Sequence, residues 1–328
     1  MRRRAGAADG QQGFALLAVM LVMSLLGVVL AEFAYSMRLE GSMVRAYKES
    51  VMATHLAEAG VHQAIREILG GGTIAALDED GQVAFYRLPP GQTTMTRIPA
   101  LQRSRVPLGP GEFSYRITDE EARLNVNYAA ADRFARLLTE LGVTGEARDV
   151  ISDSLQDWKD TNDEYRVRGA ESSDYYLKLP TPYRARNGYL QDVTELLQVR
   201  GVTPELFWGT KERVGLAELV TVFGRNSVNV NTASPAVLKA LELSEAEVSS
   251  LTQTRVRSPY SFPPIAGKGL VTISQTFRIE SEGVVAGEPQ ARVIAIVQRR
   301  LPRAAVALPN ASPPLPLSIV SWRVDPER

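Results

Sequence analysis

Hydrophobic positions are continuous near the N-terminus and become periodic after it. The stretch GFALLAVMLVMSLLGVVLAE, residues 13–32, has no charge between Phe14 and Ala31. A helix over 14–31 would rise roughly 27 Å, close to the thickness of a bilayer's hydrocarbon core. Apolar residues then recur every three or four positions as far as Ile68, before three glycines. The pattern predicts one helix over about 14–69, within an N-terminal helical segment 14–70 whose transmembrane part is 14–31.

Alternating and helical patterns divide the remainder of the chain. Residues 82–88, 93–99 and 111–119 alternate or are β-branched, with Pro-Pro-Gly and Gly-Pro-Gly between them. Residues 119–260 show helical periods, several of them opened by Ser or Thr. Strand patterns return at 270–285 and 290–301 as a hairpin around Gly287, and again at 317–324. We predict an α+β fold in which a mostly helical domain, 119–270, is inserted between strands at 71–118 and returning strands with a C-terminal tail at 271–328.

Composition narrows the possible functions. Lys and Arg number 37, as do Asp and Glu, so no net positive charge favours binding to nucleic acid. The chain has no cysteine, which excludes disulfides and thiolate chemistry and suits an oxidising compartment. Its two histidines, His55 and His62, are seven positions apart on one helical face, where we expect surface or packing roles.

Two Asn-Val-Asn segments, 125–127 and 229–231, each precede a predicted helix and suggest a pseudo-repeat. The second resembles the start of a helix-hairpin-helix module, which grips DNA phosphates through a glycine-rich hairpin. The segment ELSEAEV that follows has three glutamates and no glycine, so we expect no DNA binding. We expect Asn231 or Thr232 to cap the next helix.

The apolar N-terminal segment leaves three alternatives open. Arg2, Arg3 and Arg4 would hold the N-terminus in the cytoplasm in each case. The segment could be a signal cut after Val29-Leu30-Ala31, or it could be an uncut anchor. It also resembles a class III leader, 1–13, cut by prepilin peptidase after Gly13, which would leave an N-methylated Phe14 at the head of the helix. Most pilin-like proteins carry Glu at the fifth residue after that cut, where this chain has Ala18.

A dense acidic segment lies between Asp157 and Tyr176. Its oxygen donors, without Cys or His, suit Ca²⁺. It is not an EF-hand, because Tyr165 takes the place of the turn glycine. Either an irregular calcium loop or a solvated loop balanced by Lys159, Arg166 and Arg168 fits the sequence. Paired carboxylates could also serve hydrolysis, but without a sugar platform or a second site we expect no enzymatic activity.

Several motifs together resemble minor pseudopilin K of the type II secretion system, the general secretion pathway K family. They are QQGFALLAVMLV without the usual Glu, the skeleton DW–D–D…GAE…YY…PYRARN within 157–207, VNVNTASPAVLKAL at 228–241, and SQTFRIESEG at 274–283. The resemblance implies a pseudopilin fold, with a long N-terminal helix packed on an antiparallel sheet and a large helical insert. It implies a structural role at the tip of a pseudopilus that serves protein export across the outer membrane.

The same resemblance implies partners, location and a cofactor. The partners would be minor pseudopilins I and J, other pseudopilins and prepilin peptidase. The protein would cross the bacterial inner membrane once, with its C-terminal domain in the periplasm. It would bind Ca²⁺ in the helical domain. By position, the calcium ligands would be Asp160, Asn162, Glu171 and Asp174, with Asp157 and Asp163 as further candidates.

Three other functions compete with this one. A minor pilin of a type IV pilus shares the leader but seldom the large insert. A membrane-anchored periplasmic enzyme that binds calcium and a DNA-uptake factor are the others. The absence of Glu at position 18 favours a tip subunit. A carboxylate buried in lipid needs a partner charge from a neighbouring subunit, and a subunit with Ala18 has no such requirement.

Overall fold

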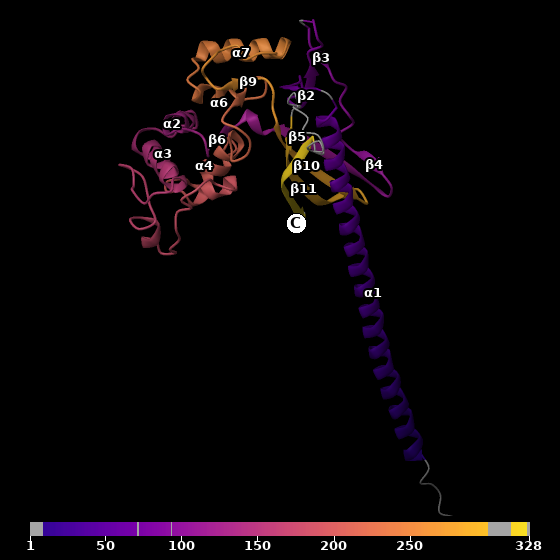
Figure 1. Cartoon of the computed structure of the whole chain (residues 1–328). Coiled ribbons are helices and arrows are strands. Elements are labelled where there is room, and N and C mark those ends of the chain that lie inside the picture. The colour runs from indigo at the N-terminus through magenta and orange to yellow at the C-terminus, as the bar shows by residue number, and fades with distance from the viewer. Residues whose placement is uncertain (1–8, 71, 93, 301–315, 327–328) are drawn as a thin grey trace, which may run out of the picture.

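A computed structural model describes the backbone of residues 9–70, 72–92, 94–300 and 316–326 (Figure 1). Helix α1 (Asp9–Ile68) is continuous, and its N-terminal half extends away from the remainder of the molecule. Among the described residues, it is the one helix long and apolar enough to cross a membrane. The predicted long helix is therefore present, and it begins earlier than the apolar run.

The C-terminal part of α1 packs on a five-stranded antiparallel sheet in the order β12-β11-β10-β5-β4. The strands are β4 (Val106–Leu108), β5 (Gly111–Asp119), β10 (Thr276–Val285), β11 (Glu288–Arg299) and β12 (Leu317–Pro326). Val61 and Ile68 of α1 are buried against Ile117, Ile279 and Val293 of the sheet. This arrangement confirms the predicted α+β class and the helix-on-sheet packing.

The contact between α1 and the sheet leaves no space for extra atoms at two glycines. A methyl group at Gly283 of β10 would overlap the Ala53 carbonyl and lie 3.0 Å from the Ala57 nitrogen. One at Gly60 of α1 would overlap the Ser281 hydroxyl and lie 2.9 Å from Phe113. These glycines set how closely the helix approaches β10.

A smaller antiparallel sheet of three strands lies beyond the end of α1. It contains β1 (Ile74–Leu77), β2 (Val83–Arg87) and β3 (Thr96–Arg97). The prediction included β2 and β3 but missed β1 and β4, which are too short to show alternation. The β10–β11 hairpin is confirmed, with Ala286 and Gly287 at positive φ in its turn.

The helical block enters after β5 and leaves before β10, although these two strands are paired neighbours. It contains three short 3₁₀ helices, η1 (Glu120–Ala122), η2 (Tyr176–Lys178) and η3 (Val193–Gln198). Its α-helices are α2 (Ala131–Glu140), α3 (Gly145–Lys159), α4 (Pro204–Trp208), α5 (Leu216–Leu219), α6 (Pro235–Ala240) and α7 (Glu245–Arg257). They enclose a core of their own, in which Phe134, Trp158 and Phe207 are buried. The block lies beside the sheet, away from the free half of α1 (Figure 1).

The two Asn-Val-Asn segments fold alike, as the suggested pseudo-repeat requires. Each begins at the last residue of a two-residue strand in a parallel pair. The pairs are β6 (Leu124–Asn125) with β7 (Val220–Thr221), and β8 (Val228–Asn229) with β9 (Leu270–Val271). In each, the first asparagine side chain accepts from the backbone N–H of the third, at 3.0 Å for Asn125 and 2.9 Å for Asn229. The third asparagine then exchanges two hydrogen bonds with a distant backbone, Asn127 with Leu190 and Asn231 with Tyr260.

The predicted cap at Asn231 or Thr232 is wrong. Ser234 caps α6, since its hydroxyl accepts from the Val237 N–H. The Asn231 side chain is occupied with Tyr260, and the Thr232 hydroxyl donates to Asp119 at 2.7 Å. Both residues serve tertiary contacts in place of the helix end.

Candidate functional site

The predicted processing site lies at the start of the free half of α1. Gly13 and Phe14 both belong to the helix. The Phe14 side chain is exposed, and so is Ala18 one turn further on. Cleavage after Gly13 and methylation of Phe14 stay predictions.

The predicted calcium ligands lie around the loop that follows α3. Asp157, in the last turn of α3, is fully buried, and its carboxylate accepts from the Arg166 guanidinium at 2.6 Å and from the Arg166 N–H at 3.0 Å. Asp160, the residue that ends the helix, accepts from the same guanidinium at 2.8 Å. Arg166 therefore neutralises two of the predicted ligands in this structure.

Glu171 differs from the other acidic residues of the loop. It is fully buried, and neither carboxylate oxygen has a hydrogen-bond partner among the described residues. Burial, followed by the charge of Asp157 and then those of Asp160 and Asp163, raises the pKa of Glu171 to about 7. A buried carboxylate without a hydrogen-bond donor is energetically costly, and a bound cation would remove this cost.

Other unpartnered oxygens belong to the same neighbourhood. Asp160 Oδ1 is buried without a partner in the described structure, as is Asn187 Oδ1. The Asn187 amide donates to Asp163 Oδ1 at 3.1 Å, which ties this asparagine to the acidic loop. Together with Glu171, these groups form a set of hard oxygen donors that fits Ca²⁺. Sequence reasoning missed Asn187, because it lies outside the acidic segment and reaches Asp163 across 24 positions of sequence.

Two of the predicted ligands have local roles. Asn162 is exposed, and its side-chain oxygen accepts from the Glu164 N–H at 2.8 Å. Asp174 accepts from the Glu171 N–H at 2.8 Å and so holds the backbone of that residue. Across the described residues, no group of three or more His, Cys, Asp or Glu is arranged to hold a metal ion. The carboxylates and Asn187 would thus have to close around an ion.

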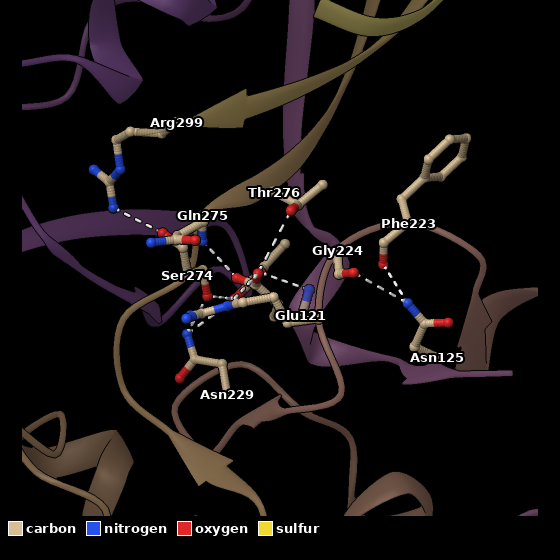
Figure 2. Close-up of polar contacts among 11 residues, drawn as sticks. Glu121, Asn125, Phe223, Gly224, Asn229, Ser274, Gln275, Thr276 and Arg299 are labelled. Carbon is tan, nitrogen blue, oxygen red and sulfur yellow. Dashed lines mark hydrogen bonds and ion pairs between the residues drawn. The ribbon is translucent and has the colours of Figure 1, made fainter. Parts of the chain in front are cut away.

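A second polar cluster, the junction cluster, joins the helical block to the sheet (Figure 2). We define it as Asp119, Glu121, Asn229, Thr232, Ser274, Gln275, Thr276 and Arg299. Asp119 is buried at the end of β5 and accepts from Ser274 at 2.6 Å, Thr232 at 2.7 Å and Asn229 at 2.9 Å. Since β5, β8 and the segment before β10 all contribute, this carboxylate fixes where the block joins the sheet.

Glu121 is the second buried carboxylate of the junction cluster. It accepts from the Gln275 N–H, and the nearest ion-pair partner, Arg225, is 3.8 Å away and half-exposed. Burial and then the charge of Asp119 raise the pKa of Glu121 to about 7. Burial also raises the pKa of Asp119, against the hydrogen bonds from Ser274, Thr232 and Asn229.

Arg299, at the end of β11, extends the junction cluster to α1. Its guanidinium donates to the backbone carbonyls of Ile68, Gly72, Thr73 and Ser274. It also lies 5.5 Å from the centre of the Phe277 ring. One buried cation therefore holds the end of α1, the start of β1 and the approach to β10.

Comparisons with known proteins identify a single family. The family model for type II secretion system (T2SS), protein K matches residues 115–214. The type II secretion system protein K of Klebsiella pneumoniae is 32% identical over 272 residues, which cover 76% of this chain and 77% of that protein. That of Pseudomonas aeruginosa is 28% identical over 272 residues, 76% of this chain and 74% of that protein.

A solved structure resembles the whole arrangement. A chain of the crystal structure of the GspK-GspI-GspJ complex from the enterotoxigenic Escherichia coli type 2 secretion system matches with a TM-score of 0.57. The match covers 89% of this chain and 99% of that one, at 17% identity. At this identity the likeness shows the fold.

Proposed function

The chain belongs to the type II secretion system protein K family of minor pseudopilins, and we propose that it is the subunit at the tip of its pseudopilus. The observation that carries the proposal is the helical block, which is inserted beside the sheet at the end opposite the free half of α1 (Figure 1). Another subunit stacked above would meet this block. Its bulk supports a capping position, in which subunits are added only from below.

Ala18 supports the same position from the other end of the molecule. In related fibres, a carboxylate at this place on the helix is thought to meet the N-terminal amine of a neighbouring subunit. Such a charge is costly inside lipid without its partner, and alanine avoids that cost. A subunit without the carboxylate loses one reason to lie beneath another subunit.

The proposed tip position can be tested by locating the chain in assembled pseudopili. The full-length chain, expressed with its cognate pseudopilins, should appear once at one end of each pseudopilus when labelled with gold. Ala18→Glu should raise the amount of chain found along the filament. Labelling along the whole filament in the unmodified protein would refute the tip position.

We also propose that the chain spans the inner membrane once through residues 14–31, with the helical block in the periplasm. The apolar helix and the three arginines before it support this topology. Mass spectrometry of the mature protein should find N-methylated Phe14 at the N-terminus. A mature N-terminus at Met1 or Glu32 would contradict processing by prepilin peptidase.

Minor pseudopilins I and J are the proposed partners. The structurally similar protein was solved in complex with GspI and GspJ. Affinity purification of the tagged full-length chain from detergent-solubilised membranes should recover the cognate I and J together. Recovery with a type IV pilin and without I and J would instead favour the alternative pilus function.

Calcium is the proposed cofactor of the acidic loop, with Glu171, Asp160, Asp157 and Asn187 as its proposed oxygen donors. The unpartnered oxygens of Glu171 are the support for this choice. Bound Ca²⁺ would order the loop by neutralising its carboxylates. The protein residues would supply the donors, and Asp174 would hold the Glu171 backbone in place.

Calorimetric titration of the metal-free protein with Ca²⁺ tests this site. Glu171→Gln should weaken binding by at least about tenfold, while Glu164→Gln, an exposed acid of the same loop, serves as the matched control. Equal binding by both variants would remove Glu171 from the site. The role we propose for the ion is structural, so turnover in substrate screens that is lost with Glu171→Gln would contradict it.

A further inference from the structure

Arg166 places a positive charge among the proposed calcium ligands of the acidic loop. One terminal nitrogen of its guanidinium donates to Asp157 at 2.6 Å and to Asp160 at 2.8 Å. The Arg166 backbone N–H donates to the second oxygen of Asp157 at 3.0 Å. Asp157 is fully buried, whereas the Arg166 side chain is 43% exposed. The buried carboxylate thus depends on a cation that reaches it from the surface.

Arg166 does not satisfy the whole site. Glu171 is fully buried, and neither of its oxygens accepts a hydrogen bond within the described structure. Asp160 Oδ1 is also buried without a partner there, although Oδ2 of the same carboxylate binds Arg166. One guanidinium, with a single charge and donors fixed in a plane, serves two carboxylates and does not reach the third. A calcium ion takes about six to eight oxygens and would serve all three.

The guanidinium and a bound ion would compete for the same oxygens. Both need the carboxylates of Asp157 and Asp160. A guanidinium within hydrogen-bond distance of these carboxylates would lie close to the ion that they coordinate, and like charges at such a separation repel strongly in a partly buried site. Asp157 and Asp160 can therefore hold Arg166 or the ion, but not both at once.

The loop is built so that Arg166 can leave its two carboxylates. Residues 161–168 are all exposed, so moving them uncovers no core. The chain is fixed again shortly after this segment, where the Glu171 N–H donates to Asp174 at 2.8 Å. Arg166 can therefore move into solvent while Glu171 keeps its place in the site.

We propose that Arg166 is an internal latch of the calcium site, which Asp157 and Asp160 release when they bind Ca²⁺. The inference rests on the calcium site of the proposed function and adds its regulation. With the latch closed, the buried Asp157 carboxylate keeps its ion pair and segment 161–168 stays folded against the end of α3. With the latch open, this segment is released, so the calcium concentration sets its position.

The latch lowers the apparent affinity of the site for the ion. Only chains in which Arg166 is displaced can bind, so the apparent Kd is the intrinsic Kd divided by the fraction of open latch. A latch that is open in about one chain of ten weakens binding about tenfold. The closed latch also protects the fold at low calcium, because a buried Asp157 without its cation is strongly destabilising.

Removing the latch should tighten calcium binding. In calorimetric titration of the full-length protein in detergent, Arg166→Gln should lower the Kd for Ca²⁺ by about tenfold or more. Arg168→Gln is the matched control and should leave the Kd unchanged. Arg168 belongs to the same loop, is 46% exposed and pairs at 2.6 Å with Asp149, which is outside the proposed ligands. An affinity of Arg166→Gln equal to or weaker than that of Arg168→Gln would overturn the latch and leave the calcium site standing.

Chemical labelling follows the latch in the unmodified chain and so does not depend on the folding of a variant. Phenylglyoxal, which reacts with unpaired guanidinium groups, should label Arg166 about tenfold faster once Ca²⁺ is added. Arg168, mapped by mass spectrometry in the same sample, controls for general access, and Mg²⁺ at the same concentration controls for ionic strength. In a chain that binds Ca²⁺, unchanged labelling of Arg166 would contradict its displacement.

The titrations also separate the latch from the calcium proposal. If the unmodified chain binds no Ca²⁺ but Arg166→Gln does, Arg166 is the group that holds the site closed, and calcium fails as the cofactor of the unmodified chain. If neither binds Ca²⁺, the calcium site and the latch fail together.

Discussion

Replacing Glu121 by glutamine is expected to stabilise the protein at alkaline pH and to leave it almost unchanged in acid. Glu121 is buried beside Asp119, with Arg225 half-exposed at 3.8 Å and Arg299 in the same cluster. Its neighbour Glu120 is held by Arg123 and Arg278, at 2.7 Å each, and so those cations are not available to Glu121. The folded protein therefore favours the protonated form of Glu121.

The size of the effect follows from the pKa of Glu121, which rises from 4.5 to about 7 on folding. Between these values the folded state binds more protons than the unfolded state, so stability falls as pH rises from 4.5 through 7. At about 1.4 kcal/mol per pKa unit, the total loss is about 3 kcal/mol. This is a large part of the 5–15 kcal/mol by which proteins of this kind are stable. Glutamine keeps an acceptor for the Gln275 N–H and cannot ionise.

Urea unfolding of the full-length protein in detergent at pH 4.5, 6 and 8 measures this difference. We expect Glu121→Gln to gain about 3 kcal/mol at pH 8 and close to nothing at pH 4.5. Glu120→Gln is the control of opposite sign. Burial opposes the ionisation of Glu120, but Arg123 and Arg278 lower its pKa, so its ion pairs stabilise above pH 4.5 and are lost as pH falls. This variant should lose about 3 kcal/mol at pH 8, because two partly buried cations are left unpaired. A gain for Glu121→Gln that is the same at all three pH values would refute the linkage.

Three further substitutions test the packing that positions the helical block. Gly283→Ala should destabilise by about 1–3 kcal/mol in urea unfolding, since the methyl overlaps the Ala53 carbonyl, whereas Gly41→Ala, in open space, should stabilise the helix by about 1 kcal/mol. A neutral Gly283→Ala would show that α1 can move off β10. Arg299→Met should lose about 3 kcal/mol and speed hydrogen exchange at residues 68–74, because four carbonyls lose their donor; exchange unchanged there would contradict its anchoring role. Asn229→Ala removes the hydrogen bonds that this side chain donates to Asp119 and to the Ala75 carbonyl, and it should loosen the attachment of the helical block. Limited proteolysis should then cut faster between β9 and β10. Asn125→Ala, its pseudo-repeat counterpart, should leave the segment between β9 and β10 protected.

Much of the fold could be predicted because long periodic segments indicate their secondary structure through local sequence patterns. The helix to Ile68, the β10–β11 hairpin and the helices capped by Thr203, Ser234 and Ser244 all have local signals. The two-residue parallel strands do not, because pairing between residues 96 positions apart in one pair and 42 in the other leaves no local pattern. Segment 193–198 shows a helical period but folds as a 3₁₀ turn, closed by a capping box between Asp192 and Glu195.

The junction cluster was hidden from sequence reasoning for a related reason. Asp119 and Glu121 stand in an acidic run that looks like a solvated boundary, and Arg299 stands beside another arginine near an apparent chain surface. Burial decides their role, and burial depends on segments that meet only in the folded chain. The same applies to Glu171, whose two carboxylate oxygens have no hydrogen-bond partner among the residues that the structure describes.

The contacts of the junction cluster explain how a large insert between two strands of a small sheet can be held rigidly. Because β5 and β10 are adjacent and antiparallel, with Asp119 opposite Phe277, the chain leaves and re-enters the sheet at a single point. A single point of attachment would leave the block free to pivot. Asp119 prevents this by binding Asn229 and Thr232 of the block together with Ser274 of the return segment. Arg299 joins the Ser274 carbonyl to the last turn of α1, so the contacts run without a gap from α1 to the helical block. We therefore expect a displacement of α1 to be transmitted to the block through these buried hydrogen bonds.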